Sequence, residues 1–123
     1  MDDLAEKLCK RIPKINKNKK RIVVVTSGPL PAACCGYDHK TQKITFRGIF
    51  PVKDVSPEKI VDTNGAGDSF AGGFLSQLVK GKFLDKCMKA GHWAAAVIIQ
   101  KRGCQIPINI RYNPDEDSDV NLK

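Results

Sequence analysis

Apolar residues near the start of the chain follow two different spacings. Between residues 2 and 11 they recur at helical spacing, and Pro13 follows as a stop, which predicts a short amphipathic helix. Residues 21–26 form a continuous β-branched run that is apolar on both faces, as in a buried parallel strand. This predicted strand ends at Thr26-Ser27-Gly28, two small hydroxyl residues followed by a glycine.

The next stretch predicts a β-hairpin. Residues 32–35 and 43–46 have strand character, and a polar turn through residues 36–39 separates them. Residues 48–52 continue as an expected edge strand, because Pro51 cannot donate a ladder hydrogen bond.

Two one-sided helical patterns occupy the second half of the chain. The first runs from Ser69 to a stop at Gly81, and the second covers residues 84–102. Gly72 and Gly73 lie inside the first helix, where each costs about 1 kcal/mol relative to alanine. Such glycines predict the close approach of another backbone.

A glycine turn, Asp62-Thr63-Asn64-Gly65-Ala66-Gly67-Asp68, precedes the first of these helices. The apolar pair Ile60-Val61 before it predicts a strand, so the segment has the pattern of strand, turn and helix N-terminus. Because glycine and alanine leave no bulk over the turn, its backbone N–H groups are expected to be open to a phosphate, which the helix dipole favours. The alternative is that Asp62 or Thr63 only caps the helix and the glycines only form a tight turn.

Asp68 is unusual in this setting, since a carboxylate would repel a phosphate unless it acts on the reacting groups. Accepting the proton of a substrate hydroxyl is the chemistry that fits best.

The composition is that of one small globular domain. Its 123 residues are 41% hydrophobic and 28% charged, which excludes a chain disordered by composition. No apolar run approaches the roughly 20 residues of a membrane helix, and no signal-peptide pattern opens the chain, so we expect no membrane partner and a cytoplasmic location. Five cysteines without a C-x-x-C pair favour free thiols over a zinc site or a disulfide framework.

The net charge of +8 favours anionic partners. Eight basic and no acidic residues lie between Lys7 and Arg21, whereas the tail from Asp115 to Asp119 is acidic. A nucleic-acid-binding module is therefore one alternative. No aromatic side chain that could stack on bases lies among the lysines, and such a module would leave the glycine turn unexplained, so no nucleic acid partner is expected.

The glycine turn and its neighbours resemble the C-terminal signature of the ribokinase-like carbohydrate kinases. Residues 62–70 and the following Gly-Gly-Phe carry the resemblance, and residues 72–79, 91–95 and 102–104 are most similar to the adenosine kinase group of that family. The match extends from about Arg21 to Pro107.

This resemblance implies an α/β fold, the C-terminal part of a ribokinase-like three-layer α/β/α fold with a β-hairpin and two packed helices. Residues 1–107 would form the C-terminal nucleotide-binding part of the kinase domain and residues 108–123 a polar acidic tail. Members of the family are far longer, and their sugar-binding and lid segments precede this part. The N-terminal half of the kinase is therefore an expected partner.

The resemblance also implies phosphoryl transfer from ATP to the 5′-hydroxyl of adenosine, giving AMP and ADP, with Mg²⁺ bridging the phosphates. Asp68 would be the catalytic base, and the N–H groups of Asn64, Gly65, Ala66 and Gly67 would stabilise the transferring phosphoryl group. Such a reaction belongs to purine salvage. Alternatives are a non-catalytic nucleotide-binding fragment that lacks the acceptor site, and a kinase for another sugar or nucleoside.

Further ATP-binding residues follow from the resemblance. Thr26 and Gly28 would line the phosphate path, Asp62 would help to hold a monovalent cation such as K⁺, and three residues would lie beside the adenine: His92, Ala95 and Ala96. From the residues alone, Thr26 to Gly28 could equally be a strand-end turn, and the alanines could equally permit tight helix packing. Asn113 to Glu116 spells the family's magnesium motif, Asn-x-x-Glu, but in an acidic tail, and we discount it.

Overall fold

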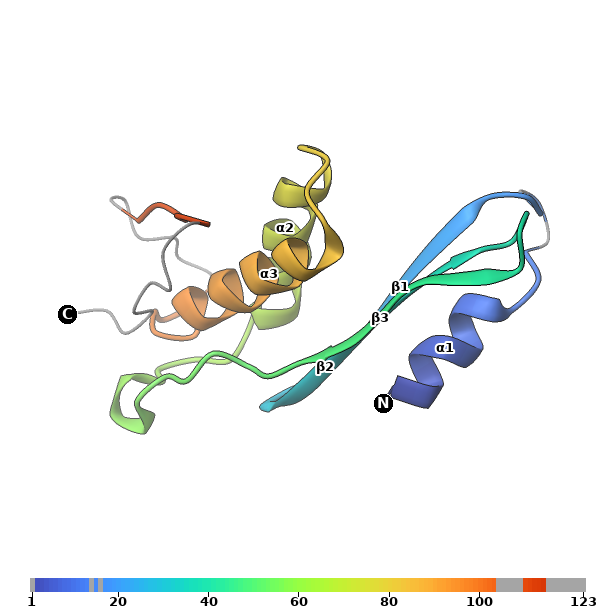
Figure 1. The fold of residues 1–123 in the computed structure, drawn as a ribbon. Coiled ribbons are helices and arrows are strands. Elements are labelled where there is room, and N and C mark those ends of the chain that lie inside the picture. The colour runs from blue at the N-terminus through green and yellow to red at the C-terminus, as the bar shows by residue number, and fades with distance from the viewer. Residues whose placement is uncertain (1, 14, 16, 104–109, 115–123) are drawn as a thin grey trace. The chain divides into compact units, whose positions relative to one another are not determined.

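The computed structural model forms two compact units, Met1–Pro51 and Val52–Lys123, which are described separately. It describes residues 2–13, 15, 17–103 and 110–114. The described part of the first unit contains one helix and three strands, and that of the second contains a 3₁₀ turn and two helices (Figure 1).

The first unit is a helix packed on a three-stranded antiparallel sheet. Helix α1 (Asp2–Lys10) is followed by β1 (Lys20–Ser27), β2 (Leu30–Asp38) and β3 (Lys43–Phe50), with β2 in the centre. Ala5 and Cys9 of α1 pack on Ala33 and Cys35 of β2, and all four are fully buried. These small side chains let the helix lie close to the central strand, and the predicted N-terminal helix is confirmed.

Strand β1 is antiparallel to β2, so the prediction of a parallel strand is wrong for this pairing. Ser27 pairs with Leu30 across a tight turn in which Gly28 has a φ of 50°. A parallel pair would need a crossover connection of about a dozen residues or more, which this turn cannot provide. The expected burial of both faces is also wrong, since Ile22 is 41% exposed.

The predicted hairpin is confirmed as β2 and β3, but its turn lies later in the chain than expected. Gly36 is inside β2, and the Asp38 carboxylate accepts the N–H groups of Lys40 and Thr41 at 2.9 and 3.4 Å. This local capping of the turn lets both strands extend. Strand β3 ends at Phe50, directly before Pro51.

Charged side chains of the sheet hold both ends of α1. Arg47 of β3 pairs with Asp2 at 2.7 Å and with Glu6 at 2.9 Å. At the other end, the Arg21 guanidinium donates to the carbonyl of Leu8 at 3.2 Å and to that of Arg11 at 2.8 Å. Acidic residues at a helix start and a cation at its end both match the helix dipole.

The Cys9 thiol adds a buried contact between helix and sheet. It donates to the carbonyls of Arg21 and Cys35, both at 3.2 Å. Burial, together with the neighbouring Cys35, raises the pKa of Cys9 to about 11. The thiol therefore stays protonated at neutral pH and keeps its role as donor.

The second unit is built on two packed helices, α2 (Ala66–Leu78) and α3 (Leu84–Ile98). Helix α2 starts three residues earlier than predicted, and α3 ends four residues earlier, where Gln100 and Lys101 donate to carbonyls three residues back.

None of the helices that the structure describes combines the length and hydrophobicity that a bilayer crossing requires.

The strand predicted at Ile60 and Val61 is not formed. After the short 3₁₀ turn η1 (Pro57–Lys59), the N–H groups of Val61 and Asp62 both donate to the carbonyl of Ile99, at 2.8 and 3.1 Å. Two donors sharing one carbonyl at a helix end replace the ladder pairing that a strand would need, so this prediction is wrong.

The two glycines within α2 have different environments. A Cβ atom at Gly73 would lie 2.5 Å from the carbonyl oxygen of Ala90 and 2.9 Å from the Cβ of Ala94, so α3 approaches here as predicted. A Cβ at Gly72 would meet nothing within 4 Å, and the same prediction is wrong there. Of these two glycines, Gly73 is the one that the contact with α3 requires.

This difference predicts opposite effects of two neighbouring substitutions. Gly73→Ala should destabilise the chain by about 1–3 kcal/mol, because the added methyl group forces the helices apart. Gly72→Ala should stabilise it by up to about 1 kcal/mol, because it only gains helix propensity. Chemical denaturation of the 123-residue chain measures both, and equal effects of the two substitutions would contradict the close approach at Gly73.

Candidate functional site

The glycine turn leads directly into α2. Gly65 is the residue before the helix and has a φ of 81°, a left-handed conformation that glycine adopts without strain. The N–H of Ser69 donates to the Gly65 carbonyl at 2.9 Å, which closes the first helical turn. The turn and the start of α2 are therefore joined at Gly65.

The Asp62 carboxylate ties this turn to the end of α3. Oδ1 accepts the N–H of Asn64 at 2.9 Å, and Oδ2 accepts the N–H of Gly103 at 3.0 Å. The bond from Asn64, then that from Gly103 and the charge of Arg102, hold the pKa of Asp62 below its usual value. Both oxygens thus have a structural role, and a role in binding K⁺ stays a prediction.

Two of the four N–H groups predicted for phosphate binding are engaged within the chain. The N–H of Asn64 donates to Asp62, which corrects the expectation that it is open to phosphate. The N–H of Ala66 donates to the Thr63 carbonyl over a long 3.3 Å. Among the described residues, no acceptor contacts the N–H of Gly65 or of Gly67. An anion at this helix start would therefore meet the N–H groups of Gly65 and Gly67 first.

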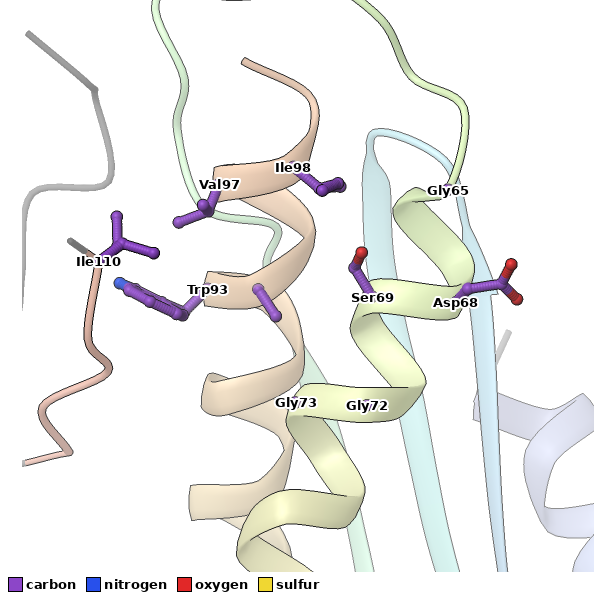
Figure 2. A pocket seen from close by; sticks show the side chains of 10 residues that line it. Gly65, Asp68, Ser69, Gly72, Gly73, Trp93, Val97, Ile98 and Ile110 are labelled. Carbon is purple, nitrogen blue, oxygen red and sulfur yellow. The ribbon is translucent and has the colours of Figure 1, made fainter. Parts of the chain in front are cut away.

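Asp68 lies in the first turn of α2 and is exposed. Figure 2 shows its carboxylate directed away from α3, whereas Ser69 lies on the side of α2 nearer to that helix. The predicted base is thus not buried in packed interior. It is within one residue of the open N–H of Gly67.

A cavity of about 470 Å³ begins at this end of α2 and extends between the two helices. Its lining is largely apolar, with few polar side chains: Gly65, Asp68, Ser69, Gly72, Gly73, Trp93, Ala94, Val97, Ile98 and Ile110. The cavity therefore joins the predicted phosphate site to an apolar surface, a combination that is typical of sites for small organic ligands.

Trp93 forms one wall of this cavity. Its ring lies 5.2 Å from that of Tyr112, measured between ring centroids, and it neighbours Ile110 (Figure 2). Neither Trp93 nor Ser69 was singled out from the sequence as a site residue. The sequence feature that could have identified these two residues is their position: Ser69 follows the glycine turn, and Trp93 lies among the small residues of α3.

The residues predicted beside adenine are not among those that line the cavity. His92 is buried and its ring packs edge-on against Phe70, with the centroids 5.0 Å apart. Ala96 is also buried, and Ala95 is half-buried. In the described structure His92 contributes to packing between the helices, and adenine contact by these three residues stays a prediction.

Thr26 and Gly28 belong to the first unit, whereas the other predicted site residues belong to the second. Thr26 is exposed at the irregular end of β1, where the register shifts between Val25 and Ser27, and Gly28 forms the turn to β2. The strand-end turn is thus confirmed, and the ATP contact of both residues stays a prediction.

Within the described residues, no group of three or more His, Cys, Asp or Glu side chains could hold a metal ion. The Asn-x-x-Glu pattern lies partly outside the described residues, because Glu116 is not among them. Among the described residues, Cys9, Cys34, Cys35 and Cys87 are buried and form no disulfide bond.

The chain matches the family model of the pfkB family carbohydrate kinases over residues 2–111. The chain belongs to this family. Its relatives include adenosine kinase 1 of Arabidopsis thaliana, 44% identical over 103 residues, which cover 84% of this chain and 28% of that protein. The adenosine kinase of Saccharomyces cerevisiae is 52% identical over 58 residues, 47% of this chain and 17% of that protein.

Solved structures of this family confirm the predicted ribokinase-like α/β fold. The Anopheles gambiae adenosine kinase in complex with P1,P4-di(adenosine-5) tetraphosphate is 42% identical, with a TM-score of 0.66 over 84% of this chain and 28% of that one. The Schistosoma mansoni adenosine kinase in complex with adenosine and AMP is 30% identical, with a TM-score of 0.68 over 85% and 28%. The chain thus spans little more than a quarter of the length of these relatives.

The double hydrogen bond of Asp62 predicts a pH-dependent loss of stability. The pKa of this carboxylate is lower in the folded chain than its ordinary 3.8, so ionised Asp62 stabilises the fold above that pH. The contribution should be lost as the pH falls through the lowered pKa of the folded state.

Thermal unfolding of the wild type and of Asp62→Asn, measured between about pH 6 and pH 2, checks this. The wild type should unfold at a higher temperature near pH 6, and this difference in unfolding temperature should disappear at low pH, where Asp62 is protonated. Faster hydrogen exchange at the Gly103 amide in the variant should accompany it. A difference that stays constant with pH would contradict the role of the charged carboxylate.

Proposed function

We propose that the chain is the nucleotide-binding part of an adenosine kinase, which transfers the γ-phosphoryl group of ATP to the 5′-hydroxyl of adenosine. Its family and its adenosine kinase relatives support this proposal. One solved relative, from S. mansoni, binds adenosine and AMP, one of the expected substrates and the expected phosphorylated product.

The observation that carries the proposal is an open helix start next to an exposed acid. The N–H groups of Gly65 and Gly67 can point at an anion at the positive end of α2, and Asp68 follows directly. A phosphate and a proton acceptor are the two groups that phosphoryl transfer to an alcohol must bring together.

In the reaction, the 5′-oxygen of adenosine forms a bond to the γ-phosphorus while the bond from that phosphorus to the ADP oxygen breaks. Asp68 takes the hydroxyl proton, so the products are AMP and ADP. The N–H groups of Gly65 and Gly67 stabilise the charge on the transferring oxygens, and the long bond from Ala66 to Thr63 leaves that N–H able to turn to a stronger acceptor.

The described residues offer no cage for a divalent ion, so Mg²⁺ is expected to arrive with ATP, held mainly by phosphate oxygens and water. No step of the proposed reaction depends on a metal ligand from these residues.

The proposal includes further contacts with ATP. Adenine would contact His92, Ala95 and Ala96, and phosphate would contact Thr26 and Gly28. The proposal also includes a cytoplasmic location and a place in purine salvage.

Two observations favour a second function, which is nucleotide binding without catalysis. The chain covers 28% of its Arabidopsis relative, and Asp68 is the one ionisable side chain that lines the cavity between α2 and α3 in the described structure. The 123 residues alone would then bind nucleotide without phosphorylating adenosine. Calorimetric titration with ATP, beside an adenosine phosphorylation assay of the same chain, distinguishes binding alone from turnover.

Asp68→Asn in the complete protein should lower kcat by at least about 100-fold, because a positioned general base contributes that much. The matched control is Asp85→Asn, which removes a carboxylate from the first turn of α3 instead. Steady-state assays with adenosine and ATP measure both. A loss below about tenfold for Asp68→Asn would rule out its role as proton acceptor.

Gly67→Val should separate catalysis from folding. A Cβ atom at Gly67 would meet nothing within 4 Å, so the fold has room for a side chain there, but the branches of valine would crowd the open N–H group. We expect kcat/KM for ATP to fall by about 10- to 100-fold, in the range seen when one such donor is removed. The unfolding temperature should not fall. Unchanged kinetics would contradict phosphate binding at this turn.

A further inference from the structure

Two buried thiols of the first unit lie in contact and have no role in the proposed function. Cys9 of α1 and Cys35 of β2 are both fully buried. The Cys9 thiol donates to the Cys35 carbonyl at 3.2 Å, and the side chain of Cys35 is a further hydrogen-bond partner of the same thiol. The two sulfur atoms therefore lie side by side in the contact between helix and sheet.

The backbones of α1 and β2 also lie close together at this contact. Ala5, one turn before Cys9, and Ala33, two residues before Cys35, are the other fully buried side chains, and both are small. The Nε2 atom of His39 lies 2.9 Å from the Cys9 carbonyl oxygen, which holds Cys9 near the end of β2. A disulfide bond joins residues whose Cα atoms are about 4.4–6.8 Å apart, and small side chains between a helix and a strand permit such an approach.

The neighbouring Cys34 is equally buried but faces the other way. Successive side chains of a strand point to opposite faces of the sheet, so Cys34 lies on the face opposite to Cys35 and to α1. Of these two adjacent cysteines, Cys35 is the one that packs against Cys9. The contact is therefore specific to one pair of thiols.

We infer that Cys9 and Cys35 form an oxidation site, at which a peroxide converts the two thiols into a disulfide bond between α1 and β2. First, the sulfur of one thiolate attacks a peroxide oxygen, the O–O bond breaks, and a sulfenic acid and hydroxide form. The second sulfur then attacks the sulfenic sulfur, so that the S–S bond forms and the S–O bond breaks. Overall, the thiols lose two electrons and two protons, and hydrogen peroxide is reduced to two water molecules.

The pair becomes accessible when α1 leaves the sheet. Neither side chain has exposed surface, and burial raises the pKa of Cys9 to about 11, so the closed unit offers a peroxide no contact and little Cys9 thiolate. Helix α1 has nine residues, too few for a helix to be stable without packing, so it opens locally. Its return to the sheet brings the oxidised sulfur against the second thiol.

Charged contacts control how often α1 is released. Arg47 of β3 pairs with Asp2 at 2.7 Å and with Glu6 at 2.9 Å, and so holds the first turns of the helix on the sheet. A disulfide bond at Cys9 would add a covalent link near the other end of the helix. Oxidation would then keep α1 in place without these ion pairs.

Peroxide treatment of the 123-residue chain tests the site. Hydrogen peroxide is added to the wild type, Cys35→Ala and Cys34→Ala, the remaining thiols are alkylated in denaturant, and linked peptides are identified by mass spectrometry. The two variants are matched, because buried alanines already lie beside these cysteines on both faces of β2, at Ala33 and Ala32. Circular dichroism before treatment checks folding, and fragment spectra of the wild type locate the linked cysteine if a variant does not fold.

The wild type and Cys34→Ala should form a link from Cys9 within one chain, and dithiothreitol should remove it. Its yield should fall at least about tenfold in Cys35→Ala, because the remaining Cys34 thiol faces away from α1. A yield in Cys35→Ala equal to that of the wild type would overturn the inference. Oxidation of Cys9 to a sulfinic acid without a link, or links only between chains, would also overturn it.

The release of α1 has a separate test. Arg47→Gln should form the link about two- to fivefold faster than the wild type, the change expected when exposed ion pairs are lost. The matched control is Lys43→Gln, which removes an exposed positive charge from the same strand and should leave the rate unchanged. An Arg47→Gln rate equal to that of the wild type would overturn the requirement that α1 leaves the sheet.

Discussion

The candidate site depends on one carboxylate that accepts two backbone N–H groups from distant parts of the chain. Asp62 binds Asn64 at 2.9 Å and Gly103 at 3.0 Å, so it fixes the turn before α2 against the segment after α3. The carbonyl of Ile99 strengthens this connection, because it accepts the N–H groups of Val61 and Asp62. Without these bonds, the turn would be held only by its link to α2 and by the bond from the Ala66 N–H to the Thr63 carbonyl.

The close approach of α2 and α3 complements this polar connection. Gly73 and Gly91 remove side chains where the helices would otherwise collide with Ala90 and Phe70. The small residues thus set how near the helices lie, and Asp62 sets how their ends are joined. Together they hold the start of α2, where Asp68 lies exposed at the edge of the cavity with its carboxylate directed away from α3.

The features that could be predicted from the sequence are those that depend on neighbouring residues, through apolar spacing and residue type. Helices α1, α2 and α3 follow from apolar spacing, and the helix start at the glycine turn follows from residue type alone. The pairing of β1 was missed because a β-branched run has the same appearance in parallel and antiparallel sheets, and only the turn at Gly28 distinguishes them. The contact at Ile99 replaced a predicted strand, which no local pattern could show.

Contacts that residue type alone does not determine explain the errors at the site. The sequence shows Asn64 inside a glycine turn, but not that Asp62 takes its N–H, and it shows two adjacent glycines without telling which of them faces α3. The ring of His92 packs against Phe70, and its contact with adenine stays a prediction. The environments of Gly73 and His92 depend on the packing of α2 against α3, whereas the bond from Asn64 to Asp62 joins residues two positions apart and is local.

The left-handed backbone at Gly65, with a φ of 81°, makes the turn selective for chirality. Any L-residue with a side chain would pay about 1–2 kcal/mol to adopt it, whereas a residue of the mirror-image configuration would adopt it as its preferred state. The entrance to α2 is thus one place in a chain of L-amino acids where a D-alanine would suit the backbone better than its natural enantiomer.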